Sequence, residues 1–357
     1  MVCLIKETEK LITKELNKSK KASIVVGVVT KDEKIVTGTI HSENEDVDKG
    51  DYVFEIGSTT KTFTSLLLSK LVLNKTIDLD QPISAYKPEY RRALSYKGKE
   101  VTFRHLSTHL SALPRENTKK LRQRMKEHKD EKHNPYKYLS QEDFNQFFID
   151  FDLKKEIEKK WRYSNIGVGL LGNTLAEILG LTFEEAITSQ ILEPLGMKDT
   201  FIKGNADQNR RYVKAYTKKG EEIPPFLVPA MNGTGALKST VHDMLMFLEH
   251  QLNIRESPLK EEIKFTHKIH SKTQWKDFNM GLGWVIERRK WSDFPIVHHD
   301  GATIGFHTYC GFIKEKQIGT VICTTSQIRP LRLIKILLGL SGRLNEDIAK
   351  TIFNKYR

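Results

Sequence analysis

The sequence predicts an α/β (α+β) fold, in which a sheet assembled from both ends of the chain is flanked by helices. Near the N-terminus, β-branched runs at residues 22–29 and 34–40 surround Asp32-Glu33, a pattern typical of a hairpin. Strand-like runs return after about residue 280, and the intervening chain shows mainly helix and loop signals. We therefore expect a sheet that is discontinuous in sequence and carries a helical insertion.

Residues 1–75 and 230–357 are expected to form the sheet domain, and residues 76–229 the inserted, mainly helical region. The insertion begins near Leu79-Asp80-Gln81-Pro82-Ile83, where the apolar helix before it has ended. A chain of 357 residues is long enough for one large domain, or two closely packed ones, with a sizeable core.

The composition describes a strongly charged globular protein with a basic surface. Hydrophobic residues make up 38% of the chain and charged residues 29%, and the formal net charge is +13. Such a charge favours binding to nucleic acid, to anionic cell-wall polymer or to a membrane surface. The lysines are nevertheless scattered along the whole chain. We therefore predict a solvated basic surface with weak attraction to anionic polymers, and no specific nucleic-acid partner.

The N-terminal residues 3–18 are expected to form a helix, because five apolar residues recur at roughly helical spacing: Leu4, Ile5, Leu11, Ile12 and Leu16. This segment has no apolar core long enough for a secretory signal, and no stretch of the sequence is long enough to span a bilayer. The sequence as written therefore predicts a cytoplasmic protein. A trimmed chain would instead derive from an extracellular or membrane-associated one.

Neither the cysteines nor the histidines form a recognisable metal pattern. The three cysteines have no regular spacing, which indicates neither a disulfide framework nor a zinc site: Cys3, Cys310 and Cys323. His105 and His109 are four residues apart on an expected helix, a spacing that suits a shared metal ion. The acid that a zinc protease needs beside the first histidine is replaced by Leu106. We therefore expect no metal and no organic cofactor.

The most informative stretch runs from Phe54 to Leu68, where an extended segment and a glycine turn lead into a helix that opens near Ser58. A serine at this position ordinarily caps the helix. Lys61 lies one turn further along the same helix face, so its amine approaches the Ser58 hydroxyl. The following residues make the helix apolar nearly all round, which indicates a buried element: Phe63, Leu66, Leu67, Leu68, Leu71, Val72 and Leu73.

Burial of the helix changes the expected protonation of Lys61 and the reactivity of Ser58. Loss of water and the positive end of the helix dipole both favour the neutral form of Lys61. A neutral amine accepts a proton from the serine hydroxyl, which makes the serine a nucleophile. Ser58 and Lys61 are thus candidate catalytic residues in a Ser-x-x-Lys arrangement.

Two further motifs follow in order and establish a family resemblance. They are Tyr163-Ser164-Asn165 and His299-Asp300-Gly301. Together with Ser-x-x-Lys, and with a typical segment at residues 101–114, they make the sequence resemble a serine β-lactamase-related hydrolase of the class C type. That group includes class C β-lactamases, D-alanyl-D-alanine carboxypeptidases, penicillin-binding proteins, D-amino-acid peptidases and esterases. The resemblance implies a β-lactamase/transpeptidase-like fold with an antiparallel sheet.

The resemblance also implies roles for individual residues. Tyr163 would be held partly or wholly as a phenolate by neighbouring positive charge and would shuttle the proton from Ser58 to the leaving group. Asn165 would donate its amide to the acyl-side carbonyl of the substrate and help to hold Lys61. Gly301 would let the substrate backbone approach. The N–H groups of Ser58 and Ala302 would form the oxyanion hole.

His299 departs from the lysine that β-lactamases carry in the third motif. Adjacent side chains of a strand point to opposite faces, so His298 and His299 do not both face the cleft, and we assign His299 to it. A histidine is mostly neutral at pH 7, whereas lysine carries a permanent charge that pairs with a substrate carboxylate. The expected substrate is therefore a D-amino-acid peptide, a β-lactam or an ester. The first candidate function is a penicillin-binding protein or D-Ala-D-Ala carboxypeptidase, and the alternative is an esterase or weak β-lactamase.

The glycines after the second motif suggest another class of protein. Gly167, Gly169 and Gly172 have the spacing of a dinucleotide-binding fingerprint. That fold requires a buried strand directly before the glycines, but the charged segment 154–160 stands there. Close packing of a helix explains these glycines better.

The segment 119–132 is a mixed, predominantly basic charge run. A solvated helix or loop is the favoured interpretation, and an arm that attracts an anionic substrate is the alternative. A non-catalytic scaffold that binds cell-wall polymer also stays open as a function for the whole chain. Retention of Ser58, Lys61 and Tyr163 argues against it.

The C-terminal third is expected to complete the sheet. Residues 306–313 and 317–324 are predicted to be its last strands. An apolar helix at residues 331–340 is expected to cover the sheet, and residues 345–356 are expected to form one more helix.

Overall fold

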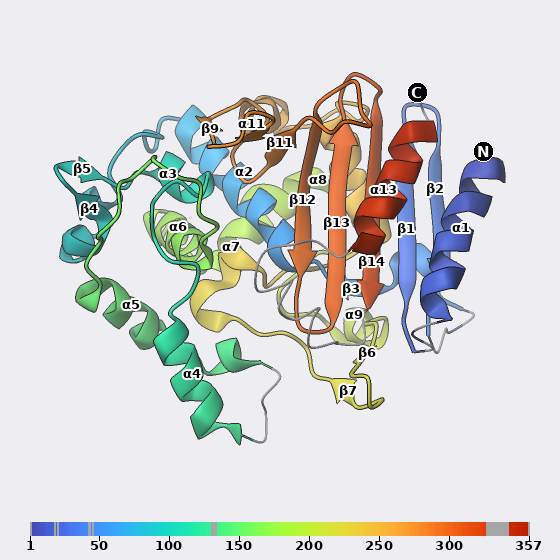
Figure 1. Ribbon diagram of the computed structural model, residues 1–357, viewed down its shortest axis with the longest axis horizontal. Helices are drawn as coiled ribbons and strands as arrows, with labels where there is room; N and C mark the ends of the chain where they lie inside the picture. Colours follow the sequence, from blue (N-terminus) through green and yellow to red (C-terminus); the bar gives the residue numbers. More distant parts are fainter. Residues whose placement is uncertain are drawn as a thin grey trace.

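The computed structural model describes residues 2–17, 19, 21–41, 44, 46–129, 134–325 and 343–355. Its main feature is an antiparallel sheet of eight strands in the order β2-β1-β14-β13-β12-β11-β10-β9 (Figure 1). The strands are β1 (Ile24–Thr30), β2 (Lys34–Thr39), β9 (Ser271–Lys272), β10 (Phe278–Met280), β11 (Val285–Glu287), β12 (Ile296–Ala302), β13 (Phe306–Ile313) and β14 (Ile318–Thr325).

The sheet joins the two ends of the chain, because the N-terminal hairpin pairs with the last strand. Ile24 lies opposite Thr324 and Thr30 lies opposite Ile318 along the β1–β14 ladder. The predicted α/β fold with an antiparallel sheet is therefore confirmed. The boundaries of the two parts at residues 75, 76, 229 and 230 stay a prediction.

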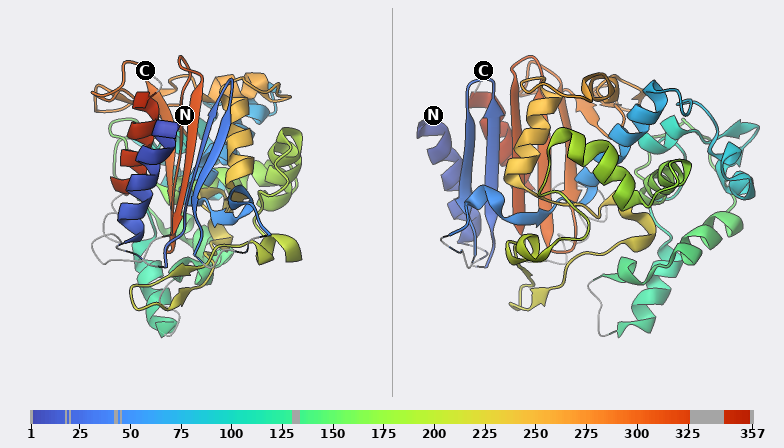
Figure 2. Two further views of the ribbon diagram at one scale, coloured as in Figure 1. Left: turned by 90° about the vertical axis from the view of Figure 1, so that its right-hand side faces the viewer. Right: turned by 180° about the vertical axis from the view of Figure 1, so that it is seen from behind.

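Helices cover both faces of the sheet. The helices α1 (Val2–Leu16) and α13 (Arg343–Lys355) lie side by side on one face, and α10 (Val241–Gln251) lies on the other (Figure 2). Because side chains alternate along a strand, Ile24, Val26 and Val28 pack toward α1 and α13, while Val25 and Val29 join the core on the α10 side. Burial on both faces explains the unbroken β-branched run.

Helices α1 and α13 agree with the helices expected at residues 3–18 and 345–356. The helix expected at residues 331–340 lies outside the described residues.

The helix α2 (Thr60–Leu73) is the central element between the sheet and the helical region. Its side chains from Thr60 to Ser69 are all buried, as the apolar pattern predicts. The short 3-10 helix η2 (Gly57–Thr59) that precedes α2 contacts β12, and α2 itself contacts α6 and α11.

The remaining helices are mostly short. They are α3 (Phe103–Ser107), α4 (Thr118–Glu127), α5 (Gln141–Asp150), α6 (Asn165–Ile178), α7 (Phe183–Ile187), α8 (Glu193–Leu195), α9 (Ala206–Arg210) and α11 (Lys260–Thr266). Among them, α3, α6, α7 and α11 contact α2. Three small two-stranded sheets complete the structure: β3 (Val53–Glu55) with β8 (Lys238–Thr240), β4 (Ser95–Tyr96) with β5 (Lys99–Glu100), and β6 (Ala215–Tyr216) with β7 (Glu222–Ile223).

The charged run at residues 119–132 forms the helix α4 over most of its length, and α4 is largely exposed. Arg124 ties it to α5 by donating from Nη2 to Asp143 Oδ2 at 2.6 Å. The interpretation as a solvated helix is confirmed for this part of the run.

Glycines let α6 approach the 3-10 helix η8 (Pro229–Thr234). A Cβ at Gly169 would lie 2.8 Å from the Met231 side chain, and one at Gly172 would lie 3.2 Å from the backbone of Gly233. No strand precedes these glycines, since residues 151–164 are irregular. Close packing therefore explains the glycine spacing, and the dinucleotide interpretation does not apply.

Within the described ranges, no single helix is long and apolar enough to cross a membrane. One helix pair, Asn165–Ile178 with Phe183–Leu195, meets the length and composition criteria only when its two members are taken together, and these are bent by 81°.

Candidate active site

Ser58 and Lys61 meet at the junction of η2 and α2. Strand β3 leads into Gly57, whose φ of +50° turns the chain sharply. Ser58 follows in η2, and Lys61 lies in the first turn of α2. Lys61 Nζ is 3.0 Å from Ser58 Oγ and donates to the Thr234 carbonyl at 2.6 Å. The spacing of three residues therefore brings the two groups into hydrogen-bond contact.

Lys61 is held in an environment that disfavours its charge. Its side chain is only 1% exposed. Burial lowers the pKa of Lys61 well below its usual value, and the positive charge of Arg115 lowers it further, whereas Glu116 acts in the opposite direction. This is the direction that the buried helix predicts, and it suits a lysine that accepts a proton from Ser58.

Tyr163 lies beside this pair, in a cluster of basic groups. Lys61 Nζ is 5.0 Å and the Arg115 guanidinium carbon 4.9 Å from the centre of the Tyr163 ring. The rings of His109 and His299 are 4.4 Å and 6.5 Å away, centre to centre. Burial nevertheless raises the pKa of Tyr163 to about 12, although the hydrogen bond with Ser58 and the charge of Arg115 lower it.

The expectation that Tyr163 rests as a phenolate is therefore wrong. The desolvation of the phenol outweighs the hydrogen bond with Ser58 and the positive charge of Arg115. At neutral pH the Tyr163 hydroxyl keeps its proton and is available as a donor.

Asn165 begins α6 and does not hold Lys61, contrary to the expectation from the resemblance. Its Nδ2 donates to Glu116 Oε1, and its buried Oδ1 has no hydrogen-bond partner among the described residues. The Thr234 carbonyl takes the role of holding Lys61. The carboxylate of Glu116 attracts the amide N–H of Asn165 more strongly than a neutral oxygen would, because its bond is charge-assisted.

His299 lies on the same side of β12 as Tyr163 and Lys61, as strand alternation predicts. Its Nδ1 is 2.8 Å from the Asp300 carbonyl. Burial lowers the pKa of His299 to about 3, and the nearby Lys61 contributes to this shift. His299 is therefore a neutral imidazole. His298 lies on the opposite face, where its Nε2 is 2.8 Å from Glu287 Oε1.

Gly301 and Ala302 connect β12 to the turn before the nucleophile. A Cβ at Gly301 would overlap the carbonyl oxygen of Ile56 and the hydroxyl of Thr308. Gly301 is therefore small because the chain's own backbone lies against it, and its contact with the substrate backbone stays a prediction. A Cβ at Gly57 would lie 2.7 Å from the amide nitrogen of Ala302, so Ala302 lies directly beside the turn that carries Ser58.

Several residues of the site were not predicted from the sequence: His109, Arg115, Glu116, Tyr136 and Thr234. Arg115 and Glu116 directly follow the segment 101–114 that supports the family resemblance, which is the one signal that marked them. Tyr136 donates its hydroxyl to Glu116 Oε1 at 2.9 Å. These hydrogen bonds join Glu116 to residues 20 and 49 positions later in the chain, and Thr234 lies 173 positions after Lys61.

The histidines His105 and His109 do not share a metal. Helix α3 ends at Ser107, and His109 has a left-handed backbone with φ of +61°. His105 Nε2 is 2.6 Å from Glu158 Oε1, whereas His109 Nδ1 accepts from the Ser164 amide at 3.3 Å. The helix ends too early for the four-residue spacing to align the two rings.

Within the part of the chain that the structure describes, one group has metal-ligand atoms within 4.8 Å of one another: Asp48, Asp51 and His242. Asp48 Oδ1 already contacts His242 Nε2 at 2.7 Å and accepts from the Gly50 amide at 2.8 Å. Hydrogen bonding accounts for this surface group.

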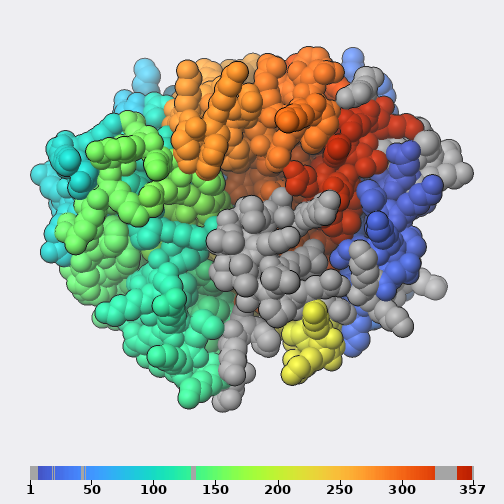
Figure 3. Space-filling model, viewed as in Figure 1, coloured from blue at the N-terminus to red at the C-terminus, as the bar shows by residue number. Residues whose placement is uncertain are grey.

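An aromatic wall extends from Tyr163 to the surface, and we define it as Trp161, Trp275 and Phe278. The Trp161 ring is 5.9 Å from Trp275 and 5.3 Å from Phe278, and Trp275 is 50% exposed. Figure 3 shows the inserted region (teal and green) adjoining residues around 270–300 (orange) on this face. The wall joins Trp161 of the inserted region to Trp275 and Phe278 beside Tyr163.

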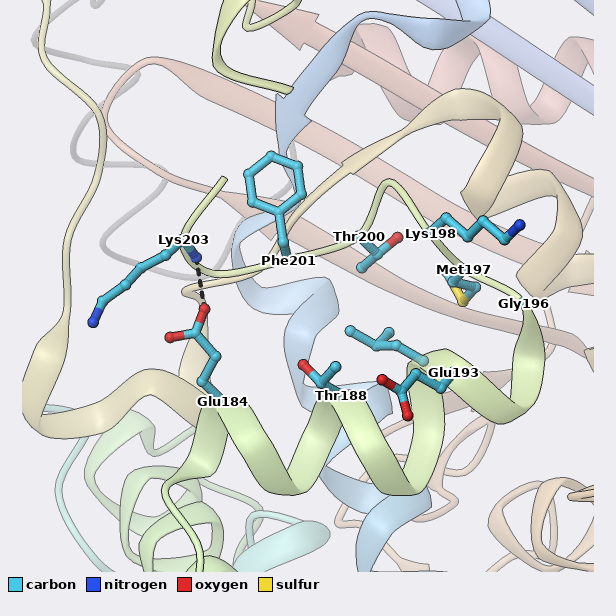
Figure 4. Close-up of a pocket in the computed structure, with 10 residues that line it drawn as sticks. Glu184, Thr188, Glu193, Gly196, Met197, Lys198, Thr200, Phe201 and Lys203 are labelled. Carbon is cyan, nitrogen blue, oxygen red and sulfur yellow. Dashed lines mark hydrogen bonds between the residues drawn. The ribbon is translucent and has the colours of Figure 1, made fainter. Parts of the chain in front are cut away.

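A separate pocket of about 450 Å³ lies along α7 and α8 (Figure 4). Its charged lining groups are mixed in sign, and Glu184 Oε1 accepts from the Lys203 amide at 2.8 Å. None of Ser58, Lys61 or Tyr163 lines it. This pocket is therefore separate from the candidate catalytic residues.

Comparison with known proteins identifies the family. A family model described as Beta-lactamase matches residues 8–338. The chain belongs to the β-lactamase family. It is a serine hydrolase of the class C type, as the three sequence motifs predict.

Curated relatives of this β-lactamase-family chain include peptidases and β-lactamases. The D-alanyl-D-alanine-carboxypeptidase/endopeptidase AmpH of Escherichia coli (strain K12) is 31% identical over 316 residues, which cover 85% of this chain and 78% of that protein. A Beta-lactamase of Escherichia coli (strain K12) is 26% identical over 306 residues, covering 76% of this chain and 74% of the relative.

Solved structures share the fold of this β-lactamase-family chain. The class C β-lactamase from Rhodobacter sphaeroides superposes with a TM-score of 0.77 at 20% identity, covering 97% of this chain and 99% of that one. At this identity the likeness concerns the fold alone.

Proposed function

We propose that this chain is a D-amino-acid peptidase of the D-Ala-D-Ala carboxypeptidase or penicillin-binding type, which acts through an acyl-enzyme on Ser58. The observation that carries the proposal is the 3.0 Å contact between Ser58 Oγ and a buried Lys61 amine of lowered pKa. The similarity to a protein named as a D-alanyl-D-alanine-carboxypeptidase/endopeptidase supports the substrate class.

In the proposed reaction, Ser58 Oγ attacks the scissile carbonyl and its proton passes to Lys61 Nζ. The amide groups of Ser58 and Ala302 stabilise the oxyanion. Tyr163, whose pKa of about 12 keeps it protonated, donates a proton to the departing amine. Water then attacks the acyl-enzyme, and Lys61 and Tyr163 return to their starting protonation states. The chemistry needs no metal or organic cofactor.

An esterase is the second candidate, and a specific observation favours it. His299 has a pKa of about 3 and is neutral, so it offers no permanent charge to a substrate carboxylate. The missing positive charge weakens the binding of a neutral ester less than that of a D-alanine carboxylate.

The test is intact-protein mass after incubation with benzylpenicillin or a fluorophosphonate, together with release of D-alanine from an acyl-D-Ala-D-Ala peptide. The peptidase proposal predicts a penicilloyl adduct and D-alanine release, both lost in Ser58→Ala. Labelling by fluorophosphonate with hydrolysis of p-nitrophenyl acetate, but no D-alanine release, would identify the esterase. If Ser58 forms no adduct and nothing is hydrolysed, the acyl-enzyme proposal is wrong and a polymer-binding scaffold becomes the better hypothesis.

A further inference from the structure

Two buried hydrogen-bond acceptors belong to side chains that are bonded to each other near the reacting groups. Glu116 Oε2 and Asn165 Oδ1 are both buried, and neither has a hydrogen-bond partner among the described residues. The other atoms of these side chains are occupied, since Glu116 Oε1 accepts from Asn165 Nδ2 and from the Tyr136 hydroxyl. Buried polar atoms are ordinarily satisfied, so a pair of unsatisfied acceptors indicates a place where a ligand supplies donors.

The orientation of the Asn165 amide is fixed by this arrangement. Exchanging its nitrogen and oxygen would set a neutral acceptor against the carboxylate of Glu116 and would break the charge-assisted bond. The free atom of Asn165 is therefore an oxygen. In this chain Asn165 presents an acceptor, whereas the family resemblance implies an amide donor at that position.

The site has the electrostatics of a cation-binding pair. Burial raises the pKa of Glu116 overall, and the hydrogen bonds from Asn165 and Tyr136 and the charges of Arg115 and Lys61 only reduce the rise. The Arg115 guanidinium lies over the Tyr163 ring, and Glu116 Oε2 stays without a hydrogen bond beside it. A buried carboxylate oxygen is best satisfied by a charged N–H donor.

The two acceptors are close to the chemistry. Asn165 follows Tyr163 by two residues, and Glu116 is near enough for the charge of Lys61 to affect its pKa. A group bound by Glu116 and Asn165 thus belongs to the part of the substrate that reaches Ser58.

We propose that Glu116 and Asn165 bind a primary ammonium group on the acyl portion of the substrate. This rests on the proposed function and names its substrate class. An ammonium supplies three N–H donors, enough for both acceptors, and its charge compensates that of Glu116. Acylation of the same amine removes the charge and leaves a single donor. The enzyme therefore selects peptides whose acyl residue carries a free amine, either at the α-position or on its side chain.

The experiment compares matched substrates that differ only in N-acetylation. One pair is D-alanine p-nitroanilide and N-acetyl-D-alanine p-nitroanilide, which tests the α-amine. The other is Nα-acetyl-L-lysyl-D-alanyl-D-alanine and its Nα,Nε-diacetyl form, which tests a side-chain amine. We expect kcat/KM for the free amine to exceed that for the acetylated form by about 10- to 100-fold in one pair, as for a hydrogen bond to a charged group.

The variant Glu116→Gln keeps the shape of the side chain and removes its charge. We expect it to lower the ratio of the two kcat/KM values toward one, while Glu261→Gln on the surface of α11 leaves the ratio unchanged. A structural role for Glu116 would lower both values together and keep the ratio. Unfolding followed by circular dichroism checks that the variant is folded.

A second measurement needs no turnover: a bound amine should protect Ser58 from fluorophosphonate labelling. D-alaninamide is compared with N-acetyl-D-alaninamide, and Nα-acetyl-L-lysinamide with its Nα,Nε-diacetyl form. Equal protection or equal kcat/KM within both pairs, or a ratio that survives Glu116→Gln, would overturn the ammonium proposal and leave the acyl-enzyme proposal intact. Absence of any Ser58-dependent labelling or hydrolysis is a different result, because it would refute both.

Discussion

His298 and His299 are neighbours on β12, yet their pKa values are shifted in opposite directions because they lie on opposite faces of the strand. On the cleft face, burial and the proximity of Lys61 lower the pKa of His299 to about 3. On the other face, burial alone would lower the pKa of His298, but the bond to Glu287 and the charges of Asp300 and Glu287 raise it overall. The cleft face lowers the pKa of Lys61 and His299, whereas the opposite face pairs its charges.

The difference shows how one strand serves both chemistry and stability. A neutral base must be kept near pH 7, and this is achieved by burying Lys61 and His299 without enough counter-charge. The opposite face carries an ion-pair network, in which the buried Glu287 contacts His298 and the partly exposed Arg289. Arg289 also contacts Glu346 on α13. Substitutions on the cleft face should therefore change mainly the acylation rate, and substitutions on the opposite face mainly the free energy of unfolding.

The largest expected effect is on the cleft face. Lys61→Met removes the amine that receives the Ser58 proton, and we expect the acylation rate to fall by about 10²- to 10⁴-fold, as for loss of a general base. The free energy of unfolding should not fall, because Met fills the same buried space without a desolvated amine. Stopped-flow acylation and urea unfolding measure the two quantities. A large loss of stability with normal acylation would contradict the division of roles.

The matched change on the opposite face is Glu287→Gln. Breaking a buried pair leaves the partner charge uncompensated, and we expect the free energy of unfolding to fall by about 3 kcal/mol. The acylation rate of the folded protein should be retained. Urea unfolding at pH 6 gives the first quantity, and labelling kinetics below the transition give the second.

The pH dependence of this pair has a definite sign. The pKa of Glu287 is lowered overall by His298 and Arg289 despite its burial, so its contribution is present above the ordinary value of 4.5 and is lost as pH falls through the folded-state pKa. The raised pKa of His298 gives a contribution that is present below 6.5 and is lost as pH rises through the folded-state pKa. The stabilisation from the pair should be greatest between these limits and should disappear in Glu287→Gln.

A smaller effect of opposite sign is expected from His299→Asn. With a folded-state pKa of about 3 against an ordinary 6.5, His299 takes up a proton only on unfolding, so it destabilises the folded protein as pH falls below 6.5. The difference is about 2 kcal/mol at pH 5. We expect the variant to be relatively more stable than the parent at pH 5 than at pH 8, by thermal unfolding at both values. An unchanged difference would show that His299 is not buried in neutral form.

The smallest effect concerns the acidic limb of the pH–rate profile. Reaction with Ser58 needs neutral Lys61, so the rate should rise with pH as Lys61 loses its proton. Arg115 lowers the pKa of Lys61, and Arg115→Gln should therefore move this limb to higher pH, by less than about one unit. Fluorophosphonate labelling rates between pH 4 and 9 measure the shift. Movement to lower pH would contradict the role of Arg115 in keeping Lys61 neutral.

Features that depend on local spacing were predictable from the sequence. Ser58 and Lys61 meet because they are one helical turn apart, and His298 and His299 separate because they alternate along a strand. The apolar run after Lys61 correctly indicated a buried helix.

Features that depend on distant contacts were not predictable. The hydrogen bond between Glu116 and Asn165 joins residues 49 positions apart, and no local sequence pattern predicts it. Nothing in the sequence shows that Ile56 lies against Gly301. The ionisation of Tyr163 was predicted with the wrong sign, since neighbouring charge is visible in a motif whereas the degree of burial is a property of the whole fold.

The close approach of β12 to the turn at Gly57 has a consequence for synthesis of the chain. The nucleophile lies in the first fifth of the sequence, but Gly301 and Ala302, which its turn packs against, come more than 240 residues later, and β1 has β14 as a neighbour. A nascent chain that has not yet released β12 to β14 from the ribosome therefore holds Ser58 and Lys61 without the framework that aligns them.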